Sequence, residues 1–204
     1  MKTHCRGNGM WLLLLLGLFG WPTGLPAEPR RTESELIEML RSTDSQKVIT
    51  ALERLPDWYP DSPNAIREIQ SLLKSKSPAP PGFPPNILKR RAARALGNYH
   101  AELSLEEVRI ILDLLRSPDR NEAMDGLKAL RGLKEPPEVR NQIVAQILPL
   151  LRDKEVHIVR DACRTLAVQG DKHTIAALEP LLNDRRADVR RDAQHAIVAL
   201  RAKP

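Results

Sequence analysis

The sequence predicts an all-α protein built from repeated helix pairs, and three observations lead to this fold class. Leu150–Ala167 returns in similar form as Leu181–Ile197, and self-similarity at such a period is typical of repeat architectures. The chain is 42% hydrophobic but only 3% aromatic, so its core must be aliphatic, and Ala and Leu favour helices. Apolar residues also recur at helical spacing, which gives each helix one stripe to bury against a neighbour.

Three predicted helices share one apolar frame, with residues at i, i+4, i+7, i+8 and i+11. A small residue at i+4 lets two helices approach closely. The three sets are Leu88, Ala92, Ala95, Leu96 and Tyr99; Val159, Cys163, Leu166, Ala167 and Gly170; and Val189, Ala193, Ala196, Ile197 and Leu200. Cys163 takes the place of Ala193 in this alignment, so we expect a small buried hydrophobe rather than a reactive thiol.

Residues 1–27 have the pattern of a secretory signal peptide. Lys2 and Arg6 precede an uncharged apolar run from Trp11 to Trp21, and Leu25-Pro26-Ala27 forms a small-residue ending. The run is shorter than the ~20 residues that a membrane-spanning helix needs. We therefore expect export, to the periplasm or the medium, with cleavage near Ala27. Because Leu25 is larger than such cleavage sites prefer, an uncleaved N-terminal anchor is the alternative.

Residues 28–204 form the predicted repeat domain, and its first helix pair follows from local signals. Thr32 and Glu35 form a capping box, which predicts a helix that ends near Leu40. Asp44 is placed to cap the second helix, and we expect Pro56 to stop it.

The next pair begins with Ser62-Pro63, a good N-cap and first-turn combination, and its second helix begins near Ile87. Residues 77–86 are rich in proline and predict an extended inserted loop. Another capping box at Ser104 and Glu107 opens the third pair. Altogether we count five pairs, whose first helices end at Leu40, Leu73, Leu115, Leu151 and Leu182.

The second helices resemble those of HEAT repeats, particularly the short bacterial form of phycobilisome lyase-type proteins, which read Asp-x-x-Val-Arg-x-x-Ala-x-x-Ala-Leu. Asp188-Val189-Arg190, Ala193 and Ala196-Ile197 match best, with Val159-Arg160 and Leu88–Leu96 close behind. The resemblance covers residues 33–204 and implies a right-handed α-solenoid of about five HEAT-like helix pairs. It says little about function, because function depends on surfaces added to a fold.

The same resemblance implies a structural ladder along the stack. In HEAT-like arrays the arginine after the conserved valine often pairs with acids of adjacent turns. Arg160 and Arg190 occupy that position here, and Lys89 is the basic equivalent in the proline-loop unit. Asp153, Asp184 and Asp188 are the acidic candidates. Direct contact of these arginines with a ligand is the alternative.

Lys89, Arg90, Arg91 and Arg94 form a basic cluster with no acidic residue nearby along the chain. Second helices line the inner face of a solenoid, so this cluster is a candidate site for an acidic protein or an anionic envelope polymer. Nucleic acid is not expected, because no aromatic residues interleave the cations for stacking. Tyr59 and Phe83 lie in proline-rich connections and are further binding candidates, because such loops project from a rigid array.

No catalytic motif stands out. The histidines show neither the i, i+4 pairing nor the cysteine partners of a metal site, and nucleophile elbows and phosphate loops are absent from the sequence. We expect no metal, no cofactor and no enzyme. The sequence favours an exported scaffold that binds a protein partner in the cell envelope, and its C-terminal face is a candidate for packing against another subunit. A bilin lyase-type enzyme, suggested by the family resemblance alone, is the less favoured alternative.

Overall fold

The computed structural model describes residues 30–75, 83–84, 86–134 and 137–203, and Thr32–Pro204 form one compact unit. The predicted signal peptide and most of the proline-rich loop lie outside these residues. Over the described part of the chain the structure has ten α-helices, three 3-10 helices and no strand, apart from one isolated bridge between Glu102 and Lys134. No helix of this part is long and apolar enough to span a membrane.

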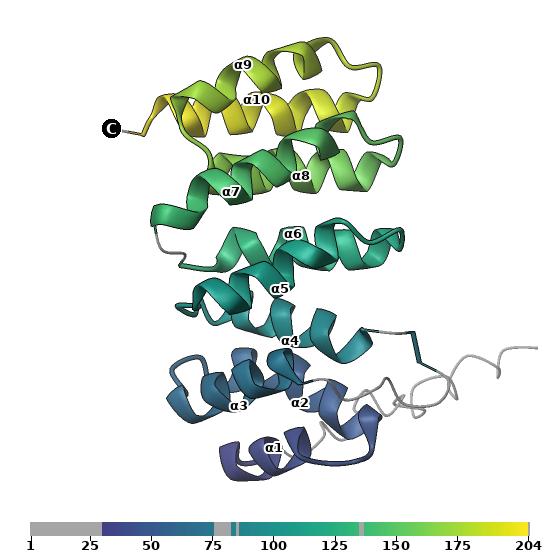
Figure 1. Ribbon diagram of the computed structural model, residues 1–204, viewed down its shortest axis with the longest axis vertical. Coiled ribbons are helices and arrows are strands. Elements are labelled where there is room, and N and C mark those ends of the chain that lie inside the picture. The colour runs from purple at the N-terminus through teal and green to yellow at the C-terminus, as the bar shows by residue number, and fades with distance from the viewer. Residues whose placement is uncertain (1–29, 76–82, 85, 135–136, 204) are drawn as a thin grey trace, which may run out of the picture. The chain divides into compact units, whose positions relative to one another are not determined.

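Five helix pairs follow one another along the chain (Figure 1), which confirms the predicted all-α solenoid. The first helices of pairs four and five each continue into a 3-10 helix. The pairs are α1 (Glu33–Leu40) with α2 (Ser45–Trp58); α3 (Pro63–Lys74) with α4 (Ile87–Asn98); α5 (Leu105–Leu115) with α6 (Arg120–Gly132); α7 (Pro137–Ile147) and η1 (Leu148–Arg152) with α8 (Val156–Gln169); and, after η2 (Lys172–Thr174), α9 (Ile175–Leu178) and η3 (Glu179–Asn183) with α10 (Ala187–Arg201).

The predicted helix starts are confirmed at atomic level. Thr32 and Ser104 each form a capping box, in which the hydroxyl accepts from the third helical amide and the glutamate there accepts from the capping residue. The carboxylate of Asp44 accepts from the amide of Gln46, and the hydroxyl of Ser62 accepts from the amide of Ala65. These caps fix where each apolar stripe begins.

Pro56 does not stop α2, contrary to the sequence-based expectation. The helix continues to Trp58, and Tyr59 closes it with a hydrogen bond from its amide to the carbonyl of Leu55. A proline removes one helical hydrogen bond, and here it does so in the last turn, where the helix ends within two residues.

The helices form two layers, because each second helix packs on the next second helix as well as on its own partner. Figure 1 shows this succession from α2 through α4, α6 and α8 to α10, with α1, α3, α5 and α7 beside them. Aliphatic side chains fill the space between the layers, among them Leu36, Leu55, Ile69, Leu96, Ile111 and Leu130.

The apolar frame of α8 is shifted by one residue from the predicted alignment. Thr165 is fully buried, whereas Ala167, which we expected in the frame, is only half-buried. The observed frame is therefore Ala162, Thr165, Leu166 and Gln169, so Ala162 rather than Cys163 corresponds to Ala193. Cys163 is nevertheless buried, and this burial, helped by the charge of Asp192, raises the pKa of its thiol to about 12.

Candidate functional site

Three buried aspartates mark one position on the second helices. Asp125 of α6, Asp161 of α8 and Asp192 of α10 each come directly before the small residue of the frame, and each is between 4% and 6% exposed. A buried carboxylate is costly unless it is paired. The basic side chains that pair with these aspartates therefore determine which charged groups of the second helices are exposed to solvent.

Two further positions on the same face are mostly basic. They lie one residue before and three residues after the aspartate position, and residues four apart share a helix face. The pairs are Arg90 and Arg94 on α4, Met124 and Lys128 on α6, Arg160 and Arg164 on α8, and Arg191 and His195 on α10. We call these the flanking positions.

At the α4–α6 interface both flanking arginines of α4 bind the aspartate of α6. Arg90 Nε donates to Asp125 Oδ2 over 3.0 Å, and Nη2 lies 2.9 Å from the same oxygen. Arg94 Nη1 lies 3.6 Å from the other oxygen, Oδ1. Arg90 is only 9% exposed, so it belongs to the packing between the helices rather than to an open surface.

The α8–α10 interface repeats this arrangement. Arg160 Nε donates to Asp192 Oδ2 over 2.8 Å, and Arg164 Nη2 lies 3.0 Å from that oxygen. Burial raises the pKa of Asp192, but the hydrogen bond from Arg160 and the charges of both arginines outweigh it, so the net pKa is lowered. Arg160 also reaches Asp188, over 3.4 Å, and Asp188 pairs with Arg191 as well.

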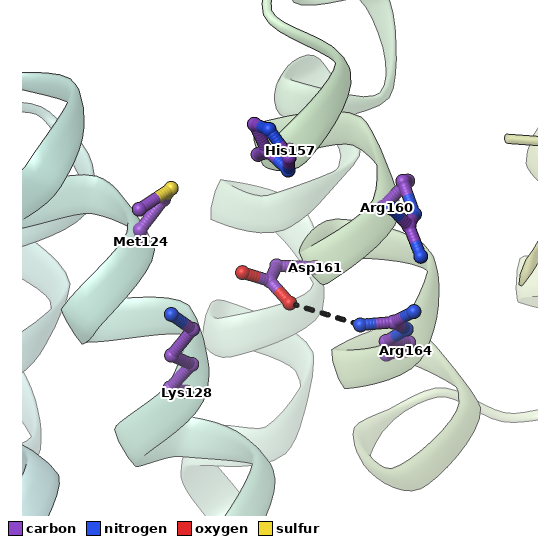
Figure 2. Close-up of a pocket in the computed structure, with 6 residues that line it drawn as sticks. All are labelled: Met124, Lys128, His157, Arg160, Asp161 and Arg164. Carbon is purple, nitrogen blue, oxygen red and sulfur yellow. Dashed lines mark ion pairs between the residues drawn. The ribbon is translucent and has the colours of Figure 1, made fainter. Parts of the chain in front are cut away.

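The α6–α8 interface between them differs, because Met124 stands where α4 and α8 carry an arginine. Asp161 has more distant cations, with Arg131 and Arg164 each 3.7 Å away. A hollow of about 280 Å³ remains between the helices, lined by Met124, Lys128, His157, Arg160, Asp161 and Arg164. Figure 2 shows the side chains of Lys128 and Asp161 extending into the space between the two helices.

Lys128 lies at the edge of this hollow and is half-buried. Within the described part of the chain no acidic side chain pairs with it, in contrast to the flanking arginines of α4 and α8. The hollow thus combines an apolar wall at Met124 with an uncompensated ammonium group.

The predicted basic cluster does have acidic neighbours, which come from adjacent helices rather than from its own stretch of chain. Arg90 and Arg94 bind Asp125, and Arg91 Nη1 lies 3.4 Å from Glu53 of α2. Lys89 is half-buried on α4. The three arginines of the cluster are therefore part of the ladder of ion pairs between helices.

Tyr59 and Phe83 are both half-buried. Tyr59 packs against the core at the end of α2. Phe83 lies just before α4, next to the part of the loop that the structure does not describe.

The predicted ladder residues are distributed over several kinds of contact. Arg190 lies on α10, the last helix of the described residues, and its Nη1 donates to the carbonyls of Asp184 and Arg185, over 2.7 and 3.2 Å. Asp184 binds Arg186 over 2.8 Å, and Asp153 binds Arg120 over 3.2 Å.

The sequence analysis missed Asp125, Asp161 and Asp192, although a signal for them existed. Each stands directly before Gly or Ala, as Asp125-Gly126, Asp161-Ala162 and Asp192-Ala193. The alignment on apolar residues hid this repetition, because it placed α8 one residue out of register. An alignment on the aspartates would have found both the frame and the ladder.

No group of three or more His, Cys, Asp or Glu side chains that could hold a metal occurs among the described residues. His157 and His195 are exposed at positions of the second-helix face, and Cys163 is buried. What this face offers chemically is cationic hydrogen-bond donors held in place by buried carboxylates.

Comparison with known proteins identifies the fold but no family. No family model and no curated protein matches the chain. Among solved structures it is similar to the CpcE–CpcF complex of phycocyanin lyase from Nostoc, with TM-score 0.63 and 22% identity over 90% of this chain and 70% of that one. An engineered protein gives TM-score 0.58 and 22% identity, covering 83% and 79% of the two chains. A designed armadillo repeat protein in complex with the peptide (KR)4 gives 0.55 and 16%, covering 81% and 80%. These similarities establish a HEAT-like and armadillo-like repeat fold.

Proposed function

We propose that this protein is an exported, non-catalytic scaffold that binds a protein partner in the cell envelope through its second-helix layer. The observation that carries the proposal is the arrangement of flanking positions, where buried aspartates fix arginines in place. Side chains that are fixed before binding lose less conformational entropy when a partner arrives. A layer of rigid helices with fixed donors can recognise a partner without any catalytic group.

The similar structures support a binding role. One is a complex of two different chains, CpcE and CpcF, and another holds a peptide. Proteins of similar fold therefore occur in complexes with a second polypeptide. For this chain the basic residues of the second-helix layer favour an acidic partner over a basic one.

A photo-crosslinking experiment in cells tests which layer binds. A photoreactive amino acid is introduced at His157 or His195, which are exposed on second helices, and at Glu106 or Arg109, which are exposed on α5. The proposal expects one common adduct from both second-helix positions and none from the α5 positions. Adducts from α5 alone would contradict it.

Export is supported by the pattern of residues 1–27, with its positive start, its apolar run and its small-residue ending. Expression of the full chain followed by N-terminal sequencing of the exported protein checks this. We expect the mature chain to begin at Glu28. Retention of the complete chain in the membrane fraction would favour the uncleaved anchor, and a cytoplasmic location would reject export.

A bilin lyase-type activity is the second candidate, favoured by the similarity to the phycocyanin lyase complex. Titration of the purified protein with a tetrapyrrole separates the two. A scaffold leaves the absorption spectrum of the pigment unchanged, whereas a lyase-type protein shifts it on binding.

A further inference from the structure

We propose that the hollow between α6 and α8 receives the carboxylate side chain of an acidic segment in the partner, with Lys128 as its main counter-charge. This inference rests on the proposed function and names the chemistry of its binding site.

The hollow exists because one side chain differs between equivalent helices. In α4, Arg90 fills the space between helices and binds Asp125. In α6 the equivalent residue is Met124, which cannot bind Asp161, so the guanidinium that reaches Asp161 from α6 is the more distant one of Arg131, 3.7 Å away. At this step the ladder lacks the close ion pair that the first flanking position makes at the α4–α6 and α8–α10 interfaces.

The charges around the hollow favour an anion. Asp161, Asp188 and Asp192 are the carboxylates at or next to it, and every one of them has a basic partner. The cations there are more numerous, and the extra positive charge is located at Lys128, which has no partner among the described residues. They are Lys128, Arg131, Arg160, Arg164 and Arg191.

The volume of the hollow and the presence of Asp161 in its lining favour a carboxylate side chain over a cofactor or a phosphate. About 280 Å³ is slightly less than the 300 Å³ or so at which small-molecule pockets begin, so the hollow suits a side chain better than a cofactor. Asp161 forms part of its lining, and its negative charge opposes a phosphate of charge near −2 more strongly than a carboxylate of charge −1.

Basic residues at the equivalent position of the neighbouring second helices form a row along the stack that includes Lys128. The later flanking position carries Arg94 on α4, Lys128 on α6 and Arg164 on α8, followed by His195 on α10. Packed helices lie about 8–10 Å apart, and an extended chain advances about 3.3 Å per residue. A basic side chain therefore recurs at about every third residue of an extended partner, and Lys128 is the one whose charge is not already paired with a buried aspartate, as those of Arg94 and Arg164 are. This spacing fits a segment with repeated Asp or Glu.

The test is fluorescence anisotropy with a labelled heptaglutamate peptide, with heptalysine as the probe of opposite charge. We expect wild type to bind heptaglutamate and not heptalysine. Lys128→Glu should weaken the binding at least about tenfold, a change of about 1.4 kcal/mol. Lys172→Glu makes the same charge change at an exposed lysine of η2 and should stay within about twofold of wild type.

Met124→Arg separates a specific hollow from general attraction by positive charge. An arginine here adds a cation to the surface but fills the hollow and pairs with Asp161. Our proposal expects weaker binding of heptaglutamate, whereas general attraction expects tighter binding. Thermal unfolding followed by circular dichroism confirms that each variant is folded before its affinity is compared.

The outcomes also separate this inference from the proposed function. Unchanged heptaglutamate binding by Lys128→Glu, tighter binding by Met124→Arg, or preferential binding of inorganic polyphosphate would each overturn the carboxylate site. If Lys128→Glu nevertheless gives the same crosslinked adduct from His157 and His195, the scaffold function stands without it. If the protein without the Lys128 substitution gives no common adduct from His157 and His195, the scaffold function itself is contradicted.

Discussion

The α4–α6 and α6–α8 interfaces join equivalent helices of consecutive repeats, yet they are held in different ways. In the first, the backbones approach so closely that a Cβ on Gly132 would lie 2.1 Å from the carbonyl oxygen of Gly97, and Arg90 with Asp125 closes the edge. In the second, Met124 leaves a hollow, and polar side chains of α8 attach the helices. Thr165 Oγ1 donates to the carbonyl of Leu127 over 3.0 Å, and Gln169 Nε2 to that of Leu130 over 2.6 Å.

The difference shows how a repeat protein can separate stability from recognition. Where the flanking arginine is present, its charge is used between the helices and contributes to packing. Where it is replaced, the next basic residue of the helix, Lys128, has no acidic partner among the described residues, and buried hydrogen bonds from α8 add to the more distant pair of Arg131 with Asp161. Both solutions use the same helical frame, so a single position decides which one a repeat adopts.

The largest effect should come from breaking the ion pair of the closer interface. Arg90→Met leaves the buried carboxylate of Asp125 with only the more distant Arg94, and we expect a loss of about 3 kcal/mol in the free energy of unfolding. Arg116→Met, which removes an exposed pair with Asp113, is the control and should cost no more than about 0.5 kcal/mol. Urea unfolding measures both. Equal effects would mean that the buried pair does not hold this interface.

A somewhat smaller effect should follow from separating the backbones of α4 and α6. A Cβ at Gly97 would meet the carbonyl oxygen of Ala129 at 2.7 Å and its Cα at 2.8 Å, so Gly97→Ala forces the helices apart. We expect a loss of about 2 kcal/mol.

Gly126→Ala is the matched control, because its Cβ would meet the flexible side chain of Leu115 at 3.0 Å. The gain in helix propensity offsets this contact, and stability should stay within about 1 kcal/mol of wild type. Thermal melts of the two variants test the pair. A Gly97→Ala protein as stable as Gly126→Ala would contradict the close approach.

At the more open interface, Thr165→Val should have a moderate effect. Valine keeps the shape of the side chain but lacks the hydroxyl hydrogen, the single donor that the carbonyls of Leu127 and Asp161 share. We expect a loss of about 1 kcal/mol by urea unfolding, the usual net value of a buried hydrogen bond. No change would show that the hydroxyl of Thr165 does not stabilise this interface.

The smallest effect should come from an ion pair that lies outside both interfaces. The hydrogen bond from Arg186 lowers the pKa of Asp184 from its usual 3.8 to about 2. Because the pKa of Asp184 is lower in the folded than in the unfolded protein, its ionised carboxylate stabilises the fold at any pH above the unfolded pKa. This contribution is lost as the pH falls through about 2. Asp184→Asn should therefore be slightly less stable than wild type at neutral pH, with the difference shrinking between about pH 4 and pH 2. A difference that does not change with pH would contradict this.

The helix pairs, their caps and the solenoid fold could be predicted from the sequence, because they depend on local spacing and on residues close along the chain. Thr32 with Glu35 and Ser104 with Glu107 are examples. The ion pairs could not, since Arg90 and Asp125 lie 35 residues apart and meet only when α4 packs on α6. The hollow could not be predicted for the same reason. A methionine at position 124 indicates a gap only when α6 is compared with the arginines at the equivalent positions of α4 and α8.

The most direct test of the binding surface is NMR of the protein with ¹³C-labelled methionine methyl groups. Met124 lines the hollow, whereas Met39 packs against the core in α1, far along the chain from the site. On addition of heptaglutamate we predict that the methyl signal of Met124 shifts with a saturating dependence on peptide concentration, while that of Met39 stays in place. Binding of the peptide with no shift at Met124, or with equal shifts of both signals, would contradict the account.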